Sequence, residues 1–196
     1  LAYMSEKRFD EELKIVDAAK KGDAKAQKLI YERYAPMMMS VCWRYVGDKE
    51  TAKDMLQDGF IKLFLKLDMY AGTGAFAGWV RRVFVTTCLE YLRQKSALKL
   101  SNPIDDVGYN LQQPDVSVID KMSADELMNL IADMPENFRT VFNLYVIEGY
   151  THAEIAELIG ITEVNSRTLF LRARKYLQNA IELLQENEKR NLQSGT

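Results

Sequence analysis

The sequence LYVIEGYTHAEIAELIGITEVNSRTLFLRARKYL, residues 144–177, has the spacing of two helices joined by a tight turn. Ala156 is small enough for two helices to cross closely, and Gly160 permits the positive φ that a tight turn needs. Thr162 is placed to cap the second helix. We therefore predict a helix-turn-helix, the motif that places its second helix in the major groove of DNA.

The second helix of this motif is expected to bury one face and expose the other. Its apolar, inward residues are Leu169, Phe170, Ala173 and Leu177. The opposite face is rich in positive charge, which a plain helical hairpin does not explain. The residues predicted to contact duplex DNA are Ser166, Arg167, Thr168, Leu171, Arg172, Arg174 and Lys175. Among them, Arg167 is expected to pair with guanine and Leu171 to touch a thymine methyl group.

The 196-residue chain has the composition of a globular protein, with 47% hydrophobic residues and a net charge of only −2. Its positive charge is concentrated in two places. Residues 79–99 carry five Lys or Arg against one Glu, a net of +4, and residues 163–178 carry four against one, a net of +3. Two separate basic helices suggest two contacts with a polyanion; the alternative is that each is a solvated helix face.

Helical patterns cover almost the whole chain, and no strand pattern is present. In the first half we expect helices over 10–21, 24–34, 48–67 and 75–95, with a further helix that begins at Pro36.

Residues 97–122 contain Pro, Gly, Asn and Asp without any period, which indicates a linker. Helices resume at Ser123 and Pro135, and the polar tail after Glu186 is expected to fray. The fold class is therefore all-α, with two small helical domains. The expected boundaries are 10–96 for the first domain, 97–122 for the flexible linker and 123–187 for the second domain.

A loop at residues 66–79, KLDMYAGTGAFAGW, precedes one of the two basic helices. Capture of single-stranded DNA requires such a combination, because unstacked bases need rings or a pocket and arginines hold the phosphates. Taken alone, Phe76 and Trp79 more often indicate core packing. The residues predicted to contact single-stranded DNA are Tyr70, Thr73, Phe76, Arg81, Arg82, Thr86 and Arg93.

No cluster of residues suited to catalysis is apparent, and the single histidine, His152, is expected to be solvated near a helix start. Metal-ligand spacing and phosphate-binding glycine loops are also missing, so we expect no enzymatic activity, no cofactor and no metal. Cys42 and Cys88 are expected to be buried free thiols in a reducing cytoplasm. The apolar runs are shorter than the roughly 20 residues that span a bilayer, which favours a cytoplasmic protein without membrane insertion.

From residue 13 to residue 177 the chain resembles the sigma-70 family of RNA polymerase sigma factors, in its small two-domain extracytoplasmic-function (ECF) group. DKETAKDMLQDGFIKLFLKL, residues 48–67, resembles region 2.2, and AFAGWVRRVFVTTCLEYLRQK, residues 75–95, resembles the helix that recognises the −10 element. Residues 134–177 resemble region 4, which recognises the −35 element.

The resemblance implies a factor that binds core RNA polymerase, recognises the −35 and −10 elements of promoter DNA and promotes DNA melting. It also implies an anti-sigma factor as a partner. Contact with the clamp helices of the polymerase β′ subunit is implied for Asp54, Gln57, Asp58 and Phe60. The chain departs from the family's usual serine and lysine at Ala75 and Ala77, and from its common Gly-Thr at Val164 and Asn165.

Two alternatives stay open on the sequence alone. One is an autonomous helix-turn-helix regulator, which would bind duplex DNA tightly without polymerase. The other is a sigma-like interaction protein without promoter activity.

Overall fold

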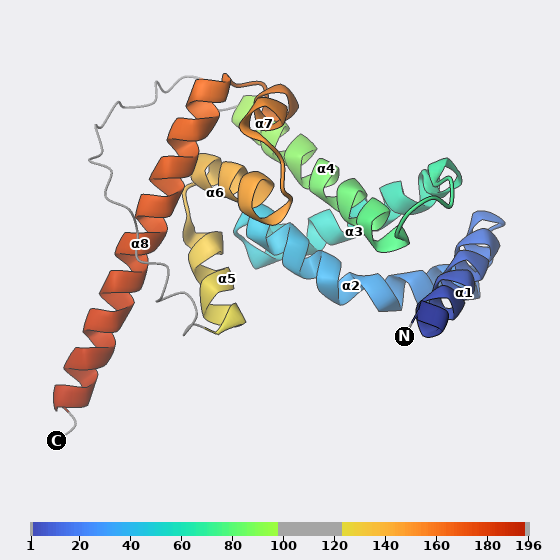
Figure 1. The fold of residues 1–196 in the computed structure, drawn as a ribbon, viewed down its shortest axis with the longest axis horizontal. Helices are drawn as coiled ribbons and strands as arrows, with labels where there is room; N and C mark the ends of the chain where they lie inside the picture. Colours follow the sequence, from blue (N-terminus) through green and yellow to red (C-terminus); the bar gives the residue numbers. More distant parts are fainter. Residues whose placement is uncertain (1, 98–122, 195–196) are drawn as a thin grey trace. The chain divides into compact units, whose positions relative to one another are not determined.

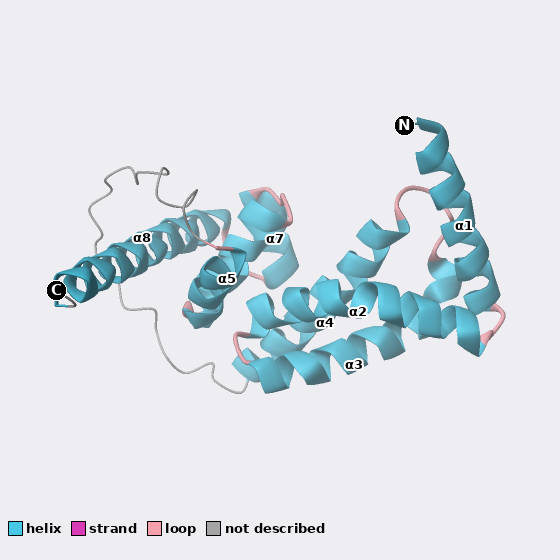
Figure 2. Ribbon diagram, turned by 90° about the horizontal axis from the view of Figure 1, so that it is seen from below, coloured by secondary structure: helices cyan, strands magenta, loops and turns pink. Residues whose placement is uncertain are grey.

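The computed structural model describes residues 2–97 and 123–194, and every regular element within these ranges is helical (Figures 1 and 2). The contacts of the chain divide it into two compact units, Leu1–Lys95 and Ser96–Thr196. The predicted all-α fold with two helical regions is confirmed. The predicted linker lies outside the described residues, except for Ala97, where a helix ends.

The first unit is built from helices whose ends follow the local sequence. Its elements are α1 (Ala2–Lys20), α2 (Ala24–Val46), α3 (Lys49–Leu65), the 3-10 turn η1 (Leu67–Met69) and α4 (Phe76–Ala97). Gly47 ends α2 with a φ of +78°. Asp48 then caps α3, because its side chain accepts a hydrogen bond from the Thr51 N–H at 2.7 Å. The predicted start of a helix at Asp48 is therefore confirmed.

Helix α2 runs through Pro36, so the prediction that a new helix begins there is wrong. A proline inside a helix removes one backbone hydrogen bond and costs about 3 kcal/mol or more. The helix continues because one buried stripe extends on both sides of the proline, from Ile30 and Tyr34 to Met38 and Val41. Pro36 itself is exposed, on the side where water can satisfy the freed carbonyl group.

The core of the first unit is formed where α2, α3 and α4 present their buried faces. The rings of Phe60 and Phe84 form a T-shaped pair with 5.0 Å between ring centroids. Cys42 on α2 and Cys88 on α4 are buried free thiols, as predicted. The structure brings them together: a hydrogen bond with Cys42, followed by burial, raises the pKa of the Cys88 thiol, which disfavours the reactive thiolate of Cys88.

The second unit has five elements after its N-terminal capping box, in which Ser123 and Glu126 satisfy each other's backbone N–H groups. They are α5 (Ala124–Asp133), α6 (Glu136–Phe142), the π-helical turn η3 (Asn143–Ile147), α7 (His152–Ile159) and α8 (Glu163–Ser194). Ile131 and Met134 pack against Ala173 and Leu177 of α8 in its core. Helix α8 continues to Ser194, so the prediction of a frayed tail is wrong.

Candidate nucleic-acid interface

The turn between α7 and α8 has the predicted helix-turn-helix geometry. Thr151 begins α7 with a capping box, and Gly160 ends it with a φ of +74°. The N–H of Gly160 donates to the carbonyl of Ala156 at 3.0 Å, which closes the last turn. Two residues later Thr162 caps α8, because its hydroxyl accepts the N–H of Asn165 at 3.1 Å. Both helix ends at this turn are therefore capped.

A buried polar pair joins the first turns of the two helices. Nδ1 of His152 lies 3.0 Å from Oγ of Ser166, and the His152 ring stacks on Tyr145 with 4.3 Å between centroids and 9° between planes. Burial, and then the positive charge of Arg167, lower the pKa of His152 below its ordinary value. The prediction of a solvated histidine is wrong. Ser166 is fully buried, so its predicted contact with DNA is wrong as well.

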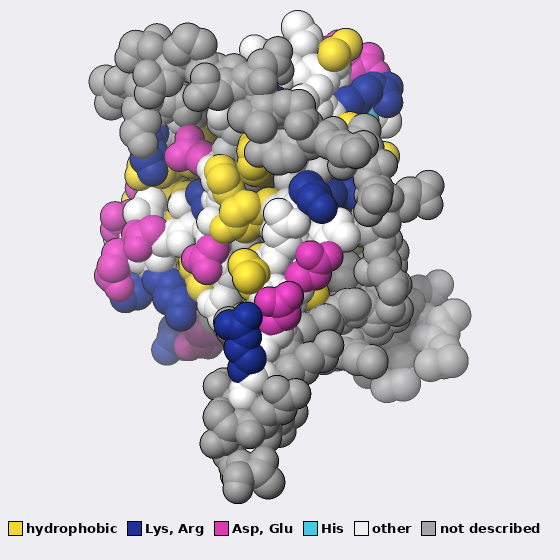
Figure 3. Space-filling model, turned by 90° about the vertical axis from the view of Figure 1, so that its left-hand side faces the viewer, with side chains coloured by type: hydrophobic (Ala, Val, Ile, Leu, Met, Phe, Trp, Pro, Cys, Tyr) yellow, Lys and Arg dark blue, Asp and Glu magenta, His cyan; other side chains and the backbone are white. Residues whose placement is uncertain are grey.

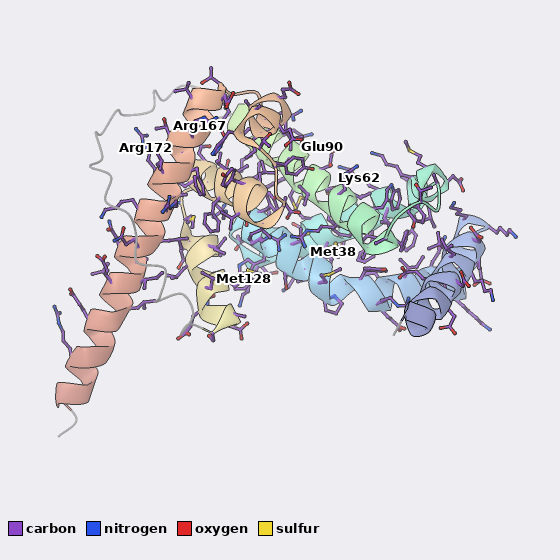
Figure 4. All side chains as sticks on the ribbon, viewed as in Figure 1. Met38, Lys62, Glu90, Met128, Arg167 and Arg172 are labelled. Carbon is purple, nitrogen blue, oxygen red and sulfur yellow. The ribbon has the colours of Figure 1, made fainter. Side chains whose placement is uncertain are left out.

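The remaining predicted residues of α8, among them Arg167 and Arg172 (Figure 4), differ in how far they are exposed. Arg167 is exposed and forms an ion pair with Glu163, one turn earlier. Thr168 is half-buried, and its hydroxyl donates to the carbonyl of Val164 at 3.0 Å. The guanidinium of Arg174 lies 5.9 Å from the ring centroid of Phe170. The other predicted residues on this face are all half-buried: Leu171, Arg172, Arg174 and Lys175.

In the first unit, the loop before α4 does not present its aromatic rings to solvent. Tyr70 and Phe76 are 3% and 1% exposed, and their ring centroids lie 5.0 Å apart. The hydroxyl of Tyr70 donates to the carbonyl of Gly74 at 2.7 Å, and Lys20 donates to the Tyr70 carbonyl at 2.8 Å. These rings anchor the loop from inside, which confirms the core packing expected of Phe76, and neither ring is open to an unstacked base in this structure. Thr73, at the loop tip, is exposed.

The outer face of α4 is accessible, as predicted. Arg82, Thr86 and Arg93 are exposed, and Arg81 is half-buried. This face also forms one wall of a small open groove with a volume of about 100 Å³. The groove is lined by Lys62, Lys66, Trp79, Arg82, Val83, Thr86, Thr87 and Glu90.

Sequence reasoning missed the α3 wall of this groove, which contributes Lys62 and Lys66. Their spacing of four residues places them on one side of α3, but nothing in the sequence states that this side faces α4. The structure shows that this side of α3 faces α4, because Nζ of Lys62 lies 2.6 Å from Oε2 of Glu90 (Figure 4). Three cationic side chains, a half-buried indole and one carboxylate therefore surround the groove.

A second surface of α3 is acidic. Asp54, Gln57 and Asp58 are all exposed and lie three or four residues apart, so they share one side of the helix. Phe60 is 4% exposed and packs between Tyr31, Phe64 and Phe84. Phe60 therefore belongs to the core, and the exposed part of this side of α3 is formed by Asp54, Gln57 and Asp58.

The described surface mixes charges of both signs. On the face shown in Figure 3, Lys and Arg side chains lie among Asp and Glu side chains rather than in one broad patch. Among residues 2–97 and 123–194, no group of three or more His, Cys, Asp or Glu is arranged to hold a metal ion. None of the described helices has the length and apolar character needed to cross a membrane.

Each of the two units matches a known protein family. Residues 30–97 match the model of sigma-70 region 2, and residues 124–189 match that of sigma-70 region 4. The ECF RNA polymerase sigma-E factor of Haemophilus influenzae is 29% identical over 192 residues, covering 92% of this chain and 100% of that protein. The sigma-E factor of Escherichia coli K12 is 27% identical over 191 residues, covering 92% and 98%.

Solved structures of similar chains include the sigma factor RpoE in complex with the anti-sigma factor NepR from Bartonella quintana. That chain is 16% identical, with a TM-score of 0.48 and coverage of 79% of this chain and 96% of the other. CnrH, solved with the cytosolic domain of CnrY, is 17% identical, with a TM-score of 0.45 and coverage of 86% and 96%. Because the two family models together match most of the sequence, in the expected order, the chain belongs to the sigma-70 family and is a sigma factor of the ECF group.

Proposed function

We infer that this sigma factor divides promoter recognition between its two units. The second unit contacts duplex DNA of the −35 element through α8, and the first unit holds the single-stranded −10 element and binds core RNA polymerase. The observation that carries the inference is the helix-turn-helix, in which α8 buries Leu169, Ala173 and Leu177 and leaves Arg167 exposed on the opposite side.

Duplex DNA fits α8 because the N-terminal residues of such a helix meet base edges in the major groove. Arginine pairs with O6 and N7 of guanine, which makes Arg167 our candidate for base recognition. The basic side chains further along, Arg172, Arg174 and Lys175, suit phosphate contacts, which position a protein without reading sequence. Ser166 takes no direct part, and its bond to His152 instead holds the two helices together.

Single-stranded DNA fits the groove between α3 and α4. Lys62, Lys66 and Arg82 place positive charge around it, while Trp79 offers an indole surface. Single strands are bound by this combination, since aromatic stacking on a base is worth about 1–3 kcal/mol and cations hold the backbone. We therefore transfer the proposed −10 contact from Tyr70 and Phe76, which are buried, to this groove together with Thr86 and Arg93.

Core polymerase fits the acidic side of α3. Asp54, Gln57 and Asp58 are exposed there, and they match the positions that dock on the polymerase β′ clamp helices in the family. We expect an anti-sigma protein to compete for the same surface, because blocking it prevents assembly of the holoenzyme.

In vitro transcription from a random promoter library tests the proposal most directly. The full chain with core enzyme should enrich templates that share two spaced elements. A gel shift should show tight binding only when core enzyme is present. Tight binding without core enzyme would favour an autonomous regulator, and no transcripts from any template would favour an interaction protein.

An Arg167→Ala variant sharpens the test. Promoter-directed transcription should fall about 5- to 150-fold, the equivalent of the ~1–3 kcal/mol that one arginine–guanine pair contributes, while binding to core enzyme stays unchanged. The matched control is Arg190→Ala, which removes an exposed arginine from the far end of α8. Equal transcription by both variants would contradict the assignment of Arg167.

A further inference from the structure

The first turn of α8 exposes a large apolar side chain. Val164 is 73% exposed, the highest exposure among the large hydrophobic residues of α8 whose side chains are described. One isolated exposed valine is ordinary on a protein surface. The position of Val164 is informative because of the residues that follow it on the same side of the helix.

Val164, Thr168 and Leu171 follow the i, i+4, i+7 spacing that aligns side chains along one helix face. The hydroxyl of Thr168 already donates its proton to the Val164 carbonyl. Because that proton is used within the helix, Thr168 offers no free hydroxyl donor between Val164 and Leu171. The result is a short apolar strip beside Arg167, which supplies positive charge from the same two turns.

We propose that Val164 determines specificity in the −35 element by contacting the C5-methyl group of one thymine. This inference rests on the proposed binding of α8 in the major groove. The thymine methyl group is the one apolar feature that base pairs present there, and small apolar side chains recognise it. Cytosine in the same place offers an amino group and no methyl, so a valine cannot pair with it and leaves it desolvated.

Deoxyuridine tests the contact, because it differs from thymidine only by the missing methyl group. Holoenzyme is formed from the full chain and core enzyme, and each thymine of a −35 element chosen from the library is replaced singly by deoxyuridine. At one position the wild-type protein should lose about fourfold in promoter occupancy, the ratio expected when one buried methyl-sized group is removed.

The Val164→Ala variant should show a smaller preference for thymine over deoxyuridine at that position, because it loses the two methyl groups that reach furthest from the helix. The exposed site keeps the variant folded, because alanine is a better helix former than valine. The matched control is Val146→Ala, which removes the same two methyl groups from another exposed valine of the same unit and should keep the fourfold preference.

Two results would overturn the inference without touching the proposed function. One is an identical deoxyuridine effect in wild type and Val164→Ala, and the other is a wild-type protein insensitive to every replacement while it still transcribes. A wild-type protein that transcribes from no template would instead contradict the proposed function itself, and this inference with it.

Discussion

Glu163 holds Arg167 by an ion pair across one turn of α8, at the place where α8 is proposed to meet guanine. Both side chains are partly exposed, at 46% and 61%, so water screens the pair and its contribution stays between about 0 and 1 kcal/mol. Before Arg167 can contact a base, it has to leave this carboxylate. Glu163 therefore competes with DNA for the arginine.

We predict that Glu163→Gln increases promoter occupancy by up to about fivefold at low salt, because the neutral amide releases Arg167 at little cost. The gain should shrink as salt rises, since screening weakens the ion pair in the wild type too. Titration of holoenzyme on promoter DNA at two salt concentrations measures this. The control is Glu186→Gln, which breaks the similar i, i+4 pair with Arg190 and should leave occupancy unchanged. Lower occupancy in Glu163→Gln would mean that the ion pair instead positions Arg167.

At the scale of helices, local sequence chemistry predicted most of what the structure contains. The caps at Asp48 and Thr162 and the turn at Gly160 depend on neighbouring residues only, and all three were predicted. The capping box at Thr151 depends on neighbouring residues too, although it was not among the predictions. The continuous helix through Pro36 could not be predicted in this way, because it is stabilised by burial against other helices.

The candidate sites divide in the same way. Periodicity identified the outer faces of α4 and α8, but it could not tell which ring or hydroxyl turns inward. Tyr70, Phe76 and Ser166 are polar or aromatic residues of a kind that binds DNA, and only tertiary contacts reveal that they are buried. Lys62 was missed for the converse reason, since its partner Glu90 lies on another helix.

The contact between α3 and α4 depends on a glycine. A Cβ atom on Gly59 would lie 2.3 Å from Cε1 of Phe84, whose ring is fully buried. We predict that Gly59→Ala destabilises the first unit by about 1–3 kcal/mol, because overpacking outweighs the better helix propensity of alanine. Gly78→Ala is the matched control: it lies in α4 with nothing within 4 Å of the new Cβ, and it should be neutral or stabilising by up to about 1 kcal/mol.

Chemical denaturation followed by tryptophan fluorescence measures both variants cleanly. The only tryptophans of the chain, Trp43 and Trp79, belong to the first unit. If the two glycine variants had the same free energy of unfolding, α3 and α4 would be able to move apart without loss of stability.

The junction of α7 and α8 should respond to pH through His152. Burial lowers the pKa of His152 in the folded state below its ordinary value of 6.5. The unfolded chain therefore binds the proton more readily, so the stability of the second unit is complete above about pH 6.5 and declines as the pH falls through the folded-state pKa. The carboxyl groups of Glu126 and Glu154 have lowered pKa values too, but their contribution is lost only below their ordinary value of 4.5.

His152 is the only histidine, so its ring protons give one resolvable NMR titration. We expect a midpoint below 6.5, together with faster amide exchange in α8 at pH 5.5 than the intrinsic rate alone explains. A His152→Gln variant should lose this extra pH dependence while keeping a neutral hydrogen-bonding group near Ser166. A midpoint at or above 6.5 would contradict the assigned burial.

For the whole molecule, the distribution of charge matters more than its sum. A net charge of −2 gives the chain no general attraction to DNA. The positive side chains proposed to meet DNA lie on α4, α8 and the α3 wall of the groove, while α3 also has an exposed acidic side. The units are thus suited to different contacts, and the polymerase contact should be separable from the DNA contacts by mutation.

We predict that Asp58→Arg abolishes recovery of the chain with core polymerase in a pull-down. The change reverses an exposed charge on the acidic side of α3, and like charges across an interface are strongly unfavourable. Denaturation followed by tryptophan fluorescence should match wild type, because Asp58 is outside the core. Glu32→Arg makes the same reversal on an exposed part of α2 and should still bind.

The two charge variants together test whether polymerase binding and −35 DNA binding belong to different units. Asp58→Arg should lose polymerase binding and, as a consequence, all transcription, whereas Arg167→Ala should keep polymerase binding and lose only promoter-directed transcription. The two defects differ because Asp58 and Arg167 belong to separate compact units. If Asp58→Arg were recovered with core enzyme as well as wild type is, the acidic side of α3 would not be the polymerase contact, and the assignment of the DNA face of α8 would stand on its own.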